Sequence, residues 1–143
     1  MLIVELLLPV FVQVAMTLVL LTMTGRARVG AIKQGEVRMA DVALGQSAWP
    51  PRVMQMSRAY QNQFELPLLF YVAVVIALIT KQADIIVVVL AWVFVALRIV
   101  HAYIHVTSNH VPTRFNAFLA GMIVLSLMWI YLAIQSTTGG LFV

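Results

Sequence analysis

Four long apolar stretches, separated by polar segments, make up most of the chain. A helix needs roughly 20 mostly apolar residues to cross the hydrocarbon core of a bilayer, which is about 30 Å thick. The apolar runs predict four such helices, over about residues 1–24, 54–80, 85–106 and 113–136. We therefore expect an all-α integral membrane protein, a four-helix bundle that forms a single transmembrane domain over residues 1–143.

The second span is unusual because a polar stretch precedes its apolar part. Only residues 66–79 are purely apolar, and this run is too short to cross a bilayer alone. A full crossing must include the segment that carries Arg58, Asn62 and Glu65. Because charged side chains are costly when they face lipid, these groups are expected to point into the bundle. Pro67 lacks a backbone N–H and predicts a kink or a polar notch in this span.

Basic residues gather on one side of the predicted bundle. The expected connections are a long polar loop, a tight turn and a short link, over residues 25–53, 81–84 and 107–113. Six of the nine Lys and Arg residues fall between Arg26 and Arg58, and the tight turn holds only Lys81. Since cytoplasmic loops carry an excess of Lys and Arg, we expect the first and third connections in the cytoplasm and both termini on the non-cytoplasmic side.

Composition excludes a soluble enzyme. Of the 143 residues, 63% are hydrophobic and 10% are charged, whereas soluble surfaces need roughly 25–35% charged residues. The net charge of +4 follows the membrane-orientation pattern and no recognition helix accompanies it, so nucleic acid is not an expected partner. The first apolar run carries Glu5 and lacks a basic start, so we expect it to belong to the mature protein and not to a signal peptide.

The chain has no cysteine. A disulfide framework, a thiolate metal site and a cysteine nucleophile are therefore excluded. Any thiol chemistry must use a thiol that a bound molecule brings.

Two stripes of polar side chains run along the second and third spans. They consist of Arg58, Asn62 and Glu65 in one span and Arg98, His101 and His105 in the next. Their spacing places each set on one helix face. At about 1.5 Å per residue, Glu65 and Arg98 lie at similar depths, about 10 and 12 Å along their spans. An unpaired charge at that depth costs at least about 2.5–3.5 kcal/mol, so we expect a Glu65–Arg98 ion pair, which either serves a function or only fixes the helix register.

The two histidines and Arg114 are further candidates for a polar site. His101 and His105 supply only half of a closed zinc site, so we expect no metal site and assign them hydrogen-bonding roles in a polar pocket. Arg114 follows Pro112 in the first turn of the fourth span. Unpaired N–H groups at a helix N-terminus reinforce its charge and favour a carboxylate, phosphate or thiolate there. The alternative is an arginine that meets lipid headgroups.

Four short motifs, taken in order, resemble those of the MAPEG family, the membrane-associated proteins in eicosanoid and glutathione metabolism. The second span carries the pattern R-x-x-x-N-x-x-E in the segment Arg58-Ala-Tyr-Gln-Asn62-Gln-Phe-Glu65-Leu-Pro. The other motifs are Thr24-Gly25-Arg26-Ala27-Arg28, Arg98-Ile-Val-His101 and Pro112-Thr-Arg114. Together they extend the resemblance over essentially the whole chain.

The resemblance implies a homotrimer of four-helix protomers that binds glutathione, as a cosubstrate, between neighbouring subunits near the cytoplasmic face. The residues implied to contact glutathione are Arg28, Asn62, Glu65, His101 and Arg114. Arg58 and Arg98 would organise the polar core. Arg114 would lower the pKa of the glutathione thiol and hold the thiolate for attack on a lipophilic electrophile or peroxide that enters from the bilayer.

Our leading hypothesis is a bacterial-type inner-membrane glutathione transferase or peroxidase that acts on lipophilic small molecules. The alternative is a non-catalytic trimeric membrane scaffold or lipid-binding protein of the same fold. Phe115, Phe118 and His105 stand where active members of the family tend to carry hydroxyl groups. Tyr103, Asn116 or His105 could restore hydrogen bonding around the sulfur. Which of them does so depends on which side chain lies on the same side of the bundle as Arg114.

Overall fold

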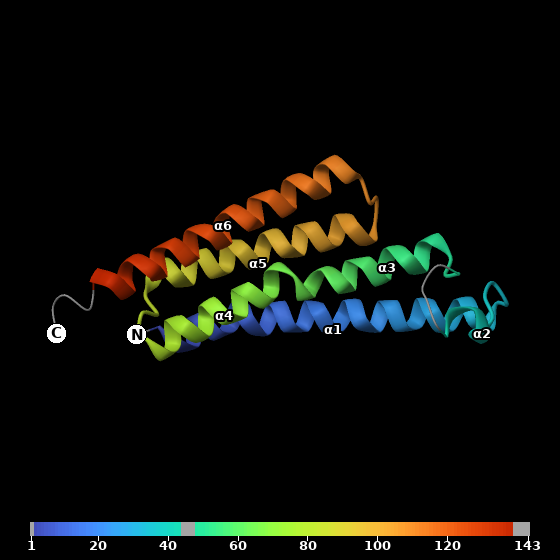
Figure 1. Ribbon diagram of the computed structural model, residues 1–143, viewed down its shortest axis with the longest axis horizontal. Helices are drawn as coiled ribbons and strands as arrows, with labels where there is room; N and C mark the ends of the chain where they lie inside the picture. Colours follow the sequence, from blue (N-terminus) through green and yellow to red (C-terminus); the bar gives the residue numbers. More distant parts are fainter. Residues whose placement is uncertain (1, 44–47, 139–143) are drawn as a thin grey trace.

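The computed structural model describes residues 2–43 and 48–138, and these residues contain helices and no strand (Figure 1). The elements are α1 (Ile3–Lys33), α2 (Met39–Val42), α3 (Pro51–Gln61), the short 3₁₀ helix η1 (Asn62–Phe64), α4 (Leu66–Ile79), α5 (Ile85–Val106) and α6 (Val111–Thr138). Four helical segments are long and apolar enough to cross a membrane, with α3 to α4 counted as one. The expected all-α fold with four candidate spans is confirmed.

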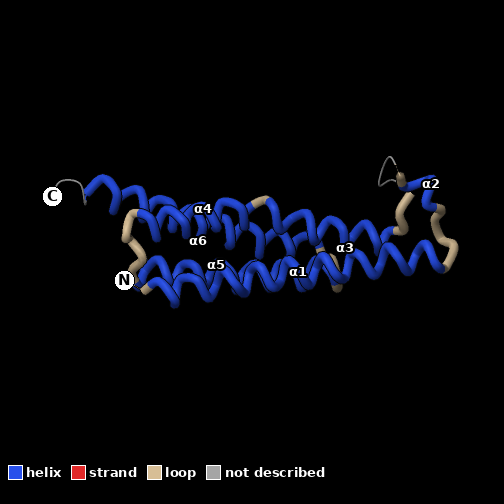
Figure 2. The backbone as a smooth tube through the Cα atoms, turned by 90° about the horizontal axis from the view of Figure 1, so that it is seen from below, coloured by secondary structure: helices blue, strands red, loops and turns tan. Residues whose placement is uncertain are grey.

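The long helices form two layers. Figures 1 and 2 together show α1 beside α5 in one layer and α6 beside α4 in the other, and α1 also packs against α3. The start of α1, the end of α6 and the α4–α5 turn lie at one end of the bundle, and the α5–α6 link points toward the other. The polar stripes of the second and third spans therefore come together near the end that carries this link.

Helix α1 is longer than expected, because it continues to Lys33. The prediction of a polar loop over residues 25–53 is therefore wrong for residues 25–33, which are helical. The segment 25–33 is too basic for the membrane interior, but Arg, Ala and Lys are good helix formers. Ala31 is buried with Val37 and Val53 in a small core of its own. Gly35, at φ +73°, follows the end of the helix in the left-handed conformation that glycine adopts without strain.

The second span is broken where Pro67 predicted a kink. The 3₁₀ helix η1 follows α3, and Glu65 has backbone angles of φ −95° and ψ −100° before α4 begins. Figure 1 shows the change of direction between α3 and α4. Buried amides support the break, since Gln13 of α1 donates to the Gln63 side chain at 3.0 Å and Gln63 donates to the Ala59 carbonyl at 3.0 Å. The predicted kink is confirmed.

The hydrophobic core occupies the half of the bundle that holds the start of α1 and the α4–α5 turn. Its centre includes Phe70 of α4 stacked on Phe94 of α5, with ring centroids 4.9 Å apart, and the buried Leu6 and Met128. The buried polar side chains Arg98, His101 and His105 lie further along α5, toward its C-terminal end. The fold thus divides the bundle into an apolar half and a half that holds the buried polar side chains.

Asp84 joins the start of α5 to the end of α6. Its carboxylate accepts hydrogen bonds from the Val87 N–H at 3.0 Å, the Tyr131 hydroxyl at 2.6 Å and the Gln135 amide at 2.7 Å. Burial raises the pKa of Asp84, but the hydrogen bonds from Tyr131, Val87 and Gln135 outweigh burial and leave this pKa below its ordinary value of 3.8.

Substituting Asp84 with alanine should destabilise the protein by about 1–2 kcal/mol, since it removes a helix N-cap. A depressed carboxyl pKa adds stability above the unfolded pKa and loses it as the pH falls through the folded one. The unfolding temperature of the wild type in detergent should therefore drop below about pH 4 more steeply than that of Asp84→Asn. Asp41→Asn, at an exposed carboxylate, is the control. Equal acid sensitivity in Asp84→Asn and the wild type would contradict the assignment.

Candidate functional site

A polar cavity of about 500 Å³ opens between α3, the C-terminal end of α5 and the N-terminal end of α6. Its polar lining includes Gln55, Arg58, Asn62, Glu65, His105 and Arg114. These residues come from sequence positions that are far apart. The break between α3 and α4 forms one wall, because Asn62 and Glu65 lie within it.

Arg98 is buried below this cavity and is held by Asn62. The Arg98 side chain is 1% exposed, and its Nη2 donates to the Asn62 carbonyl at 3.0 Å and to the Asn62 side-chain oxygen at 2.6 Å. Asn62 in turn donates through Nδ2 to the Glu65 carboxylate at 3.2 Å. Asn62 therefore connects the Arg98 guanidinium to the Glu65 carboxylate through hydrogen bonds.

The prediction of a direct ion pair between Glu65 and Arg98 is wrong. Within residues 2–43 and 48–138, the only oppositely charged pair closer than 4.0 Å is Arg38 with Asp41. The expectation assumed a continuous helix through Glu65, whereas η1 and the turned backbone at Glu65 leave its side chain exposed. The two charges remain coupled across Asn62 without touching.

Arg114 reaches the cavity from the first turn of α6, as the sequence predicted. The helix begins at Val111, and the backbone N–H of Arg114 donates to the His110 carbonyl at 3.0 Å. The half-buried guanidinium donates from Nη1 to the side-chain oxygen of Asn109. Asn109 has φ +51°, a left-handed conformation that asparagine tolerates better than most residues. The α5–α6 link thus orients Arg114.

His105 is the polar group that lies beside Arg114 in the cavity. It is 6% exposed, whereas Tyr103 is 67% exposed and Asn116 is also exposed. The Nδ1 atom of His105 is buried without a hydrogen-bond partner among the described residues. The imidazole can therefore meet a ligand through Nε2. Of the three groups that the sequence left open, His105 is the one placed at the cavity.

Two of the five predicted contact residues lie outside the cavity of their own chain. Arg28 donates from Nη2 to the Ser57 hydroxyl at 3.0 Å, and its guanidinium lies 5.5 Å from the centre of the Trp49 ring. His101 is 3% exposed and packs against the rings of His105 and Phe118, with centroids 5.7 and 6.0 Å away. The cavity brings together the other three: Asn62, Glu65 and Arg114.

Two polar residues that line the cavity were not predicted from the sequence. Gln55 donates from Nε2 to the carbonyls of His105 at 2.7 Å and Thr107 at 3.3 Å, which ties α3 to the last turn of α5. Asn109 holds Arg114. Gln55 lies three residues before Arg58 on the same face, so extension of the polar stripe by one turn would have found it. Asn109 carried no such signal.

The comparison with known families decides the identity of this fold. The model of the MAPEG family matches residues 6–134, which is nearly the whole chain. The chain belongs to the MAPEG family. This family includes glutathione transferases and peroxidases along with other members, and its proteins are generally oligomeric. No curated protein and no solved structure matches the chain.

Family membership and the helices together make this MAPEG protein an integral membrane protein. Members of the family use glutathione. The cavity has matching chemistry, because guanidinium groups at Arg58 and Arg114 can bind carboxylates and Glu65 can bind an ammonium group. Arg58, which the family resemblance assigned to the polar core, is exposed and lines the cavity instead. The cavity therefore offers charged partners for both the carboxylates and the ammonium group of a small zwitterion.

Proposed function

We propose that this MAPEG protein binds glutathione, or a similar thiol, in the polar cavity and uses it against lipophilic electrophiles or peroxides. The observation that carries the proposal is the convergence of Arg58, Glu65 and Arg114 on one cavity of about 500 Å³. Glutathione presents two carboxylates and one ammonium group, for which these charges are matched partners. Asn62 and Gln55 add neutral hydrogen-bonding groups.

The chemistry rests on the ligand, since the chain has no cysteine. Arg114, beside the N-terminus of α6, stabilises the thiolate, and the proton leaves to water at the open cavity. His105 donates a hydrogen bond to the sulfur through Nε2. In transfer, the sulfur lone pair forms the carbon–sulfur bond as the leaving group departs with its electron pair. In peroxide reduction, two glutathione molecules become one disulfide while the peroxide becomes an alcohol and water.

A homotrimer in the bacterial inner membrane, with both termini on the non-cytoplasmic side, completes the proposal. Arg28 does not line the cavity of its own chain, yet the family resemblance assigns it to the ligand. In a trimer, Arg28 of one protomer would face the cavity of the next. Its hydrogen bond to Ser57 holds it at the membrane end that carries the cavity.

Isothermal titration of the detergent-solubilised protein with glutathione tests the binding step. We expect saturable binding at millimolar thiol or below, weakened about tenfold or more in Glu65→Gln, because the ligand ammonium then lacks its charged partner. Arg38→Ala, whose side chain pairs with Asp41 at the surface, should bind as the wild type does. No heat of binding at millimolar glutathione would reject the ligand.

The second candidate function is a non-catalytic scaffold or lipid-binding protein of the same fold. One observation favours it: no Ser, Thr or Tyr side chain lines the cavity within the described part of the chain. A hydroxyl donor near the sulfur is therefore missing, and only Arg114 and His105 stand in for it. Conjugation of chlorodinitrobenzene by the purified trimer with glutathione distinguishes the two, since a scaffold would show no turnover.

A further inference from the structure

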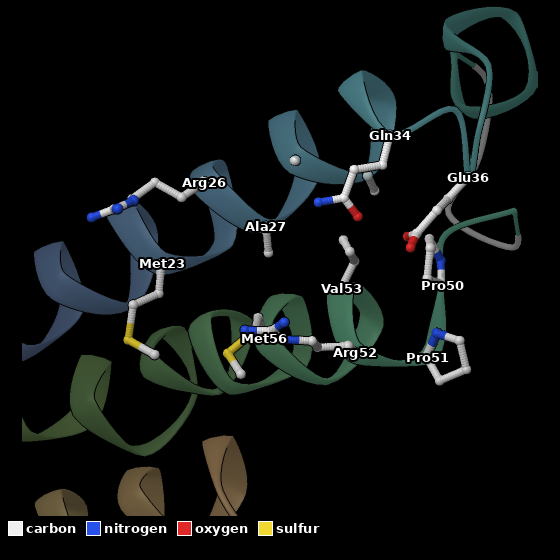
Figure 3. Close-up of a pocket in the computed structure, with 12 residues that line it drawn as sticks. Met23, Arg26, Ala27, Gln34, Glu36, Pro50, Pro51, Arg52, Val53 and Met56 are labelled. Carbon is white, nitrogen blue, oxygen red and sulfur yellow. The ribbon is translucent and has the colours of Figure 1, made fainter.

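A second cavity, of about 700 Å³, lies between the C-terminal part of α1 and the start of α3 (Figure 3). Most of its lining is apolar, and four polar side chains interrupt it. These are Arg26, Gln34, Glu36 and Arg52. The sequence reasoning assigned none of them a ligand.

This cavity and the proposed glutathione cavity lie on opposite faces of α3. Successive helical residues are rotated by about 100°, so Met56, which lines this cavity, points away from Arg58, which lines the other. On α1, Arg26 lines this cavity, whereas Arg28, two residues later, does not and donates a hydrogen bond to Ser57 of α3 instead. Pro51 is the one lining residue in common. The two cavities can therefore hold different ligands.

The chemistry of the second cavity changes along its length. Met23 and Met56 lie at the inner end, toward the apolar parts of α1 and α3, as Figure 3 shows. Arg26 lies one turn outward from Met23 on α1, and Arg52 one turn outward from Met56 on α3. In Figure 3 the Arg52 side chain runs along the α3 wall toward Met56. The Arg26 side chain instead runs away from Arg52 and Glu36, past Met23, so only the α3 wall passes from a flexible methionine to a guanidinium.

The outer end carries the opposite charge. Gln34 and the carboxylate of Glu36 point into the cavity near Pro50 (Figure 3). Gln34 lies eight residues beyond Arg26 in the chain, which is about 12 Å along a helix. On the α3 side of the cavity, the order from the inside outward is therefore apolar at Met56, cationic at Arg52 and anionic at Glu36.

The charged groups of this cavity are free to receive a ligand. Arg26, Glu36 and Arg52 are exposed, and none forms an ion pair with the residues that the structure describes. Their hydrogen-bonding groups are therefore not committed to structure. Gly30 adds room on the α1 wall, because a Cβ there would meet nothing within 4 Å.

We propose that this cavity binds a membrane phospholipid whose headgroup carries a phosphate and a primary ammonium, as in phosphatidylethanolamine. The acyl chains pack on Met23 and Met56, whose flexible side chains adapt to irregular apolar shapes. Arg52, which lies between Met56 and the outer end, donates to the phosphate, which suits a planar guanidinium group. The ammonium, which lies further from the acyl chains than the phosphate, donates to Glu36. The order of charges in the headgroup matches the order in the cavity.

Lipid titration of the full chain in detergent, followed by native mass spectrometry, tests the proposal. We expect phosphatidylethanolamine to bind more tightly than phosphatidylglycerol, which lacks the ammonium, and than phosphatidylcholine, whose ammonium has no N–H. Arg52→Ala should weaken the first lipid about fivefold. Glu36→Gln should weaken phosphatidylethanolamine and leave phosphatidylglycerol unchanged or tighter.

Lys33→Ala is the matched control, since it removes a positive charge from the last turn of α1 without touching the cavity. Equal binding of the three lipids, or an Arg52→Ala variant that binds as Lys33→Ala does, would overturn the proposal. Unfolding temperatures of the variants at these exposed positions show whether the fold is kept. Glutathione binding, titrated in the same samples, should not change, so failure of the lipid site and failure of the glutathione site are separable.

Discussion

Asn62→Ala is expected to destabilise the folded protein in detergent by about 1.5–3 kcal/mol, the range for a hydrogen bond to a charged group. The Arg98 guanidinium is buried, and its hydrogen bonds within the described residues go to Asn62. Its Nε and Nη1 atoms already lack partners there. Loss of the 2.6 Å bond to the Asn62 side chain leaves the charge with a single backbone acceptor. Unfolding in denaturant, followed by circular dichroism, measures the change.

A double-mutant cycle separates this contact from a general loss of packing. Arg98→Met removes the buried charge but keeps apolar volume, so Asn62→Ala should be much less harmful in that background. Glu65→Ala is the variant for comparison, because Glu65 accepts the hydrogen bond from the Asn62 amide. Because Glu65 is exposed and touches Asn62, not Arg98, its loss should be milder than that of Asn62. Additive effects of Asn62→Ala and Arg98→Met would show that the contact contributes nothing.

The sequence predicted the spans well because hydrophobicity within a membrane is a strong constraint. Helix α5 (Ile85–Val106), which forms the third span, begins and ends where its apolar run does. The end of α1 could not be found in this way. Hydropathy marks where a helix leaves the lipid, whereas Ala31 shows that the helix continues in polar surroundings to pack on Val53.

The candidate site was predictable in its composition but not in its contacts. Spacing on an ideal helix brought Asn62, Glu65 and Arg98 to similar depth, and the structure does place them within one chain of hydrogen bonds. The 3₁₀ turn after Gln61 changed which atoms touch, and a turn of three residues has no periodic signal of its own. The facing of His105 relative to Arg114 depends on how α5 packs against α6. Local sequence does not encode that rotation.

Arg114→Ala should lower the rate of glutathione conjugation by about 100-fold to 1,000-fold, the usual effect of removing one group that stabilises developing negative charge. In the proposed site, this guanidinium stands beside the N-terminus of α6 and faces the sulfur. Without it, the pKa of the bound thiol rises and less thiolate is present at neutral pH. The ultraviolet absorbance of bound thiolate, followed against pH, measures this directly and does not depend on turnover.

Two further variants, Arg114→Lys and Arg38→Ala, test whether the effect of Arg114→Ala comes from the guanidinium at this position. Lysine keeps the charge but not the planar pair of donors, so it should restore part of the thiolate signal. Arg38→Ala removes an exposed arginine that pairs with Asp41 and should retain both signal and rate. The hydrogen bond from Arg114 to Asn109 lies at the N-terminal end of α6, away from the hydrophobic core, so the oligomer and its unfolding temperature should be preserved. A protein that loses neither thiolate nor rate in Arg114→Ala uses glutathione in another way, and one that never shows a thiolate fits the scaffold.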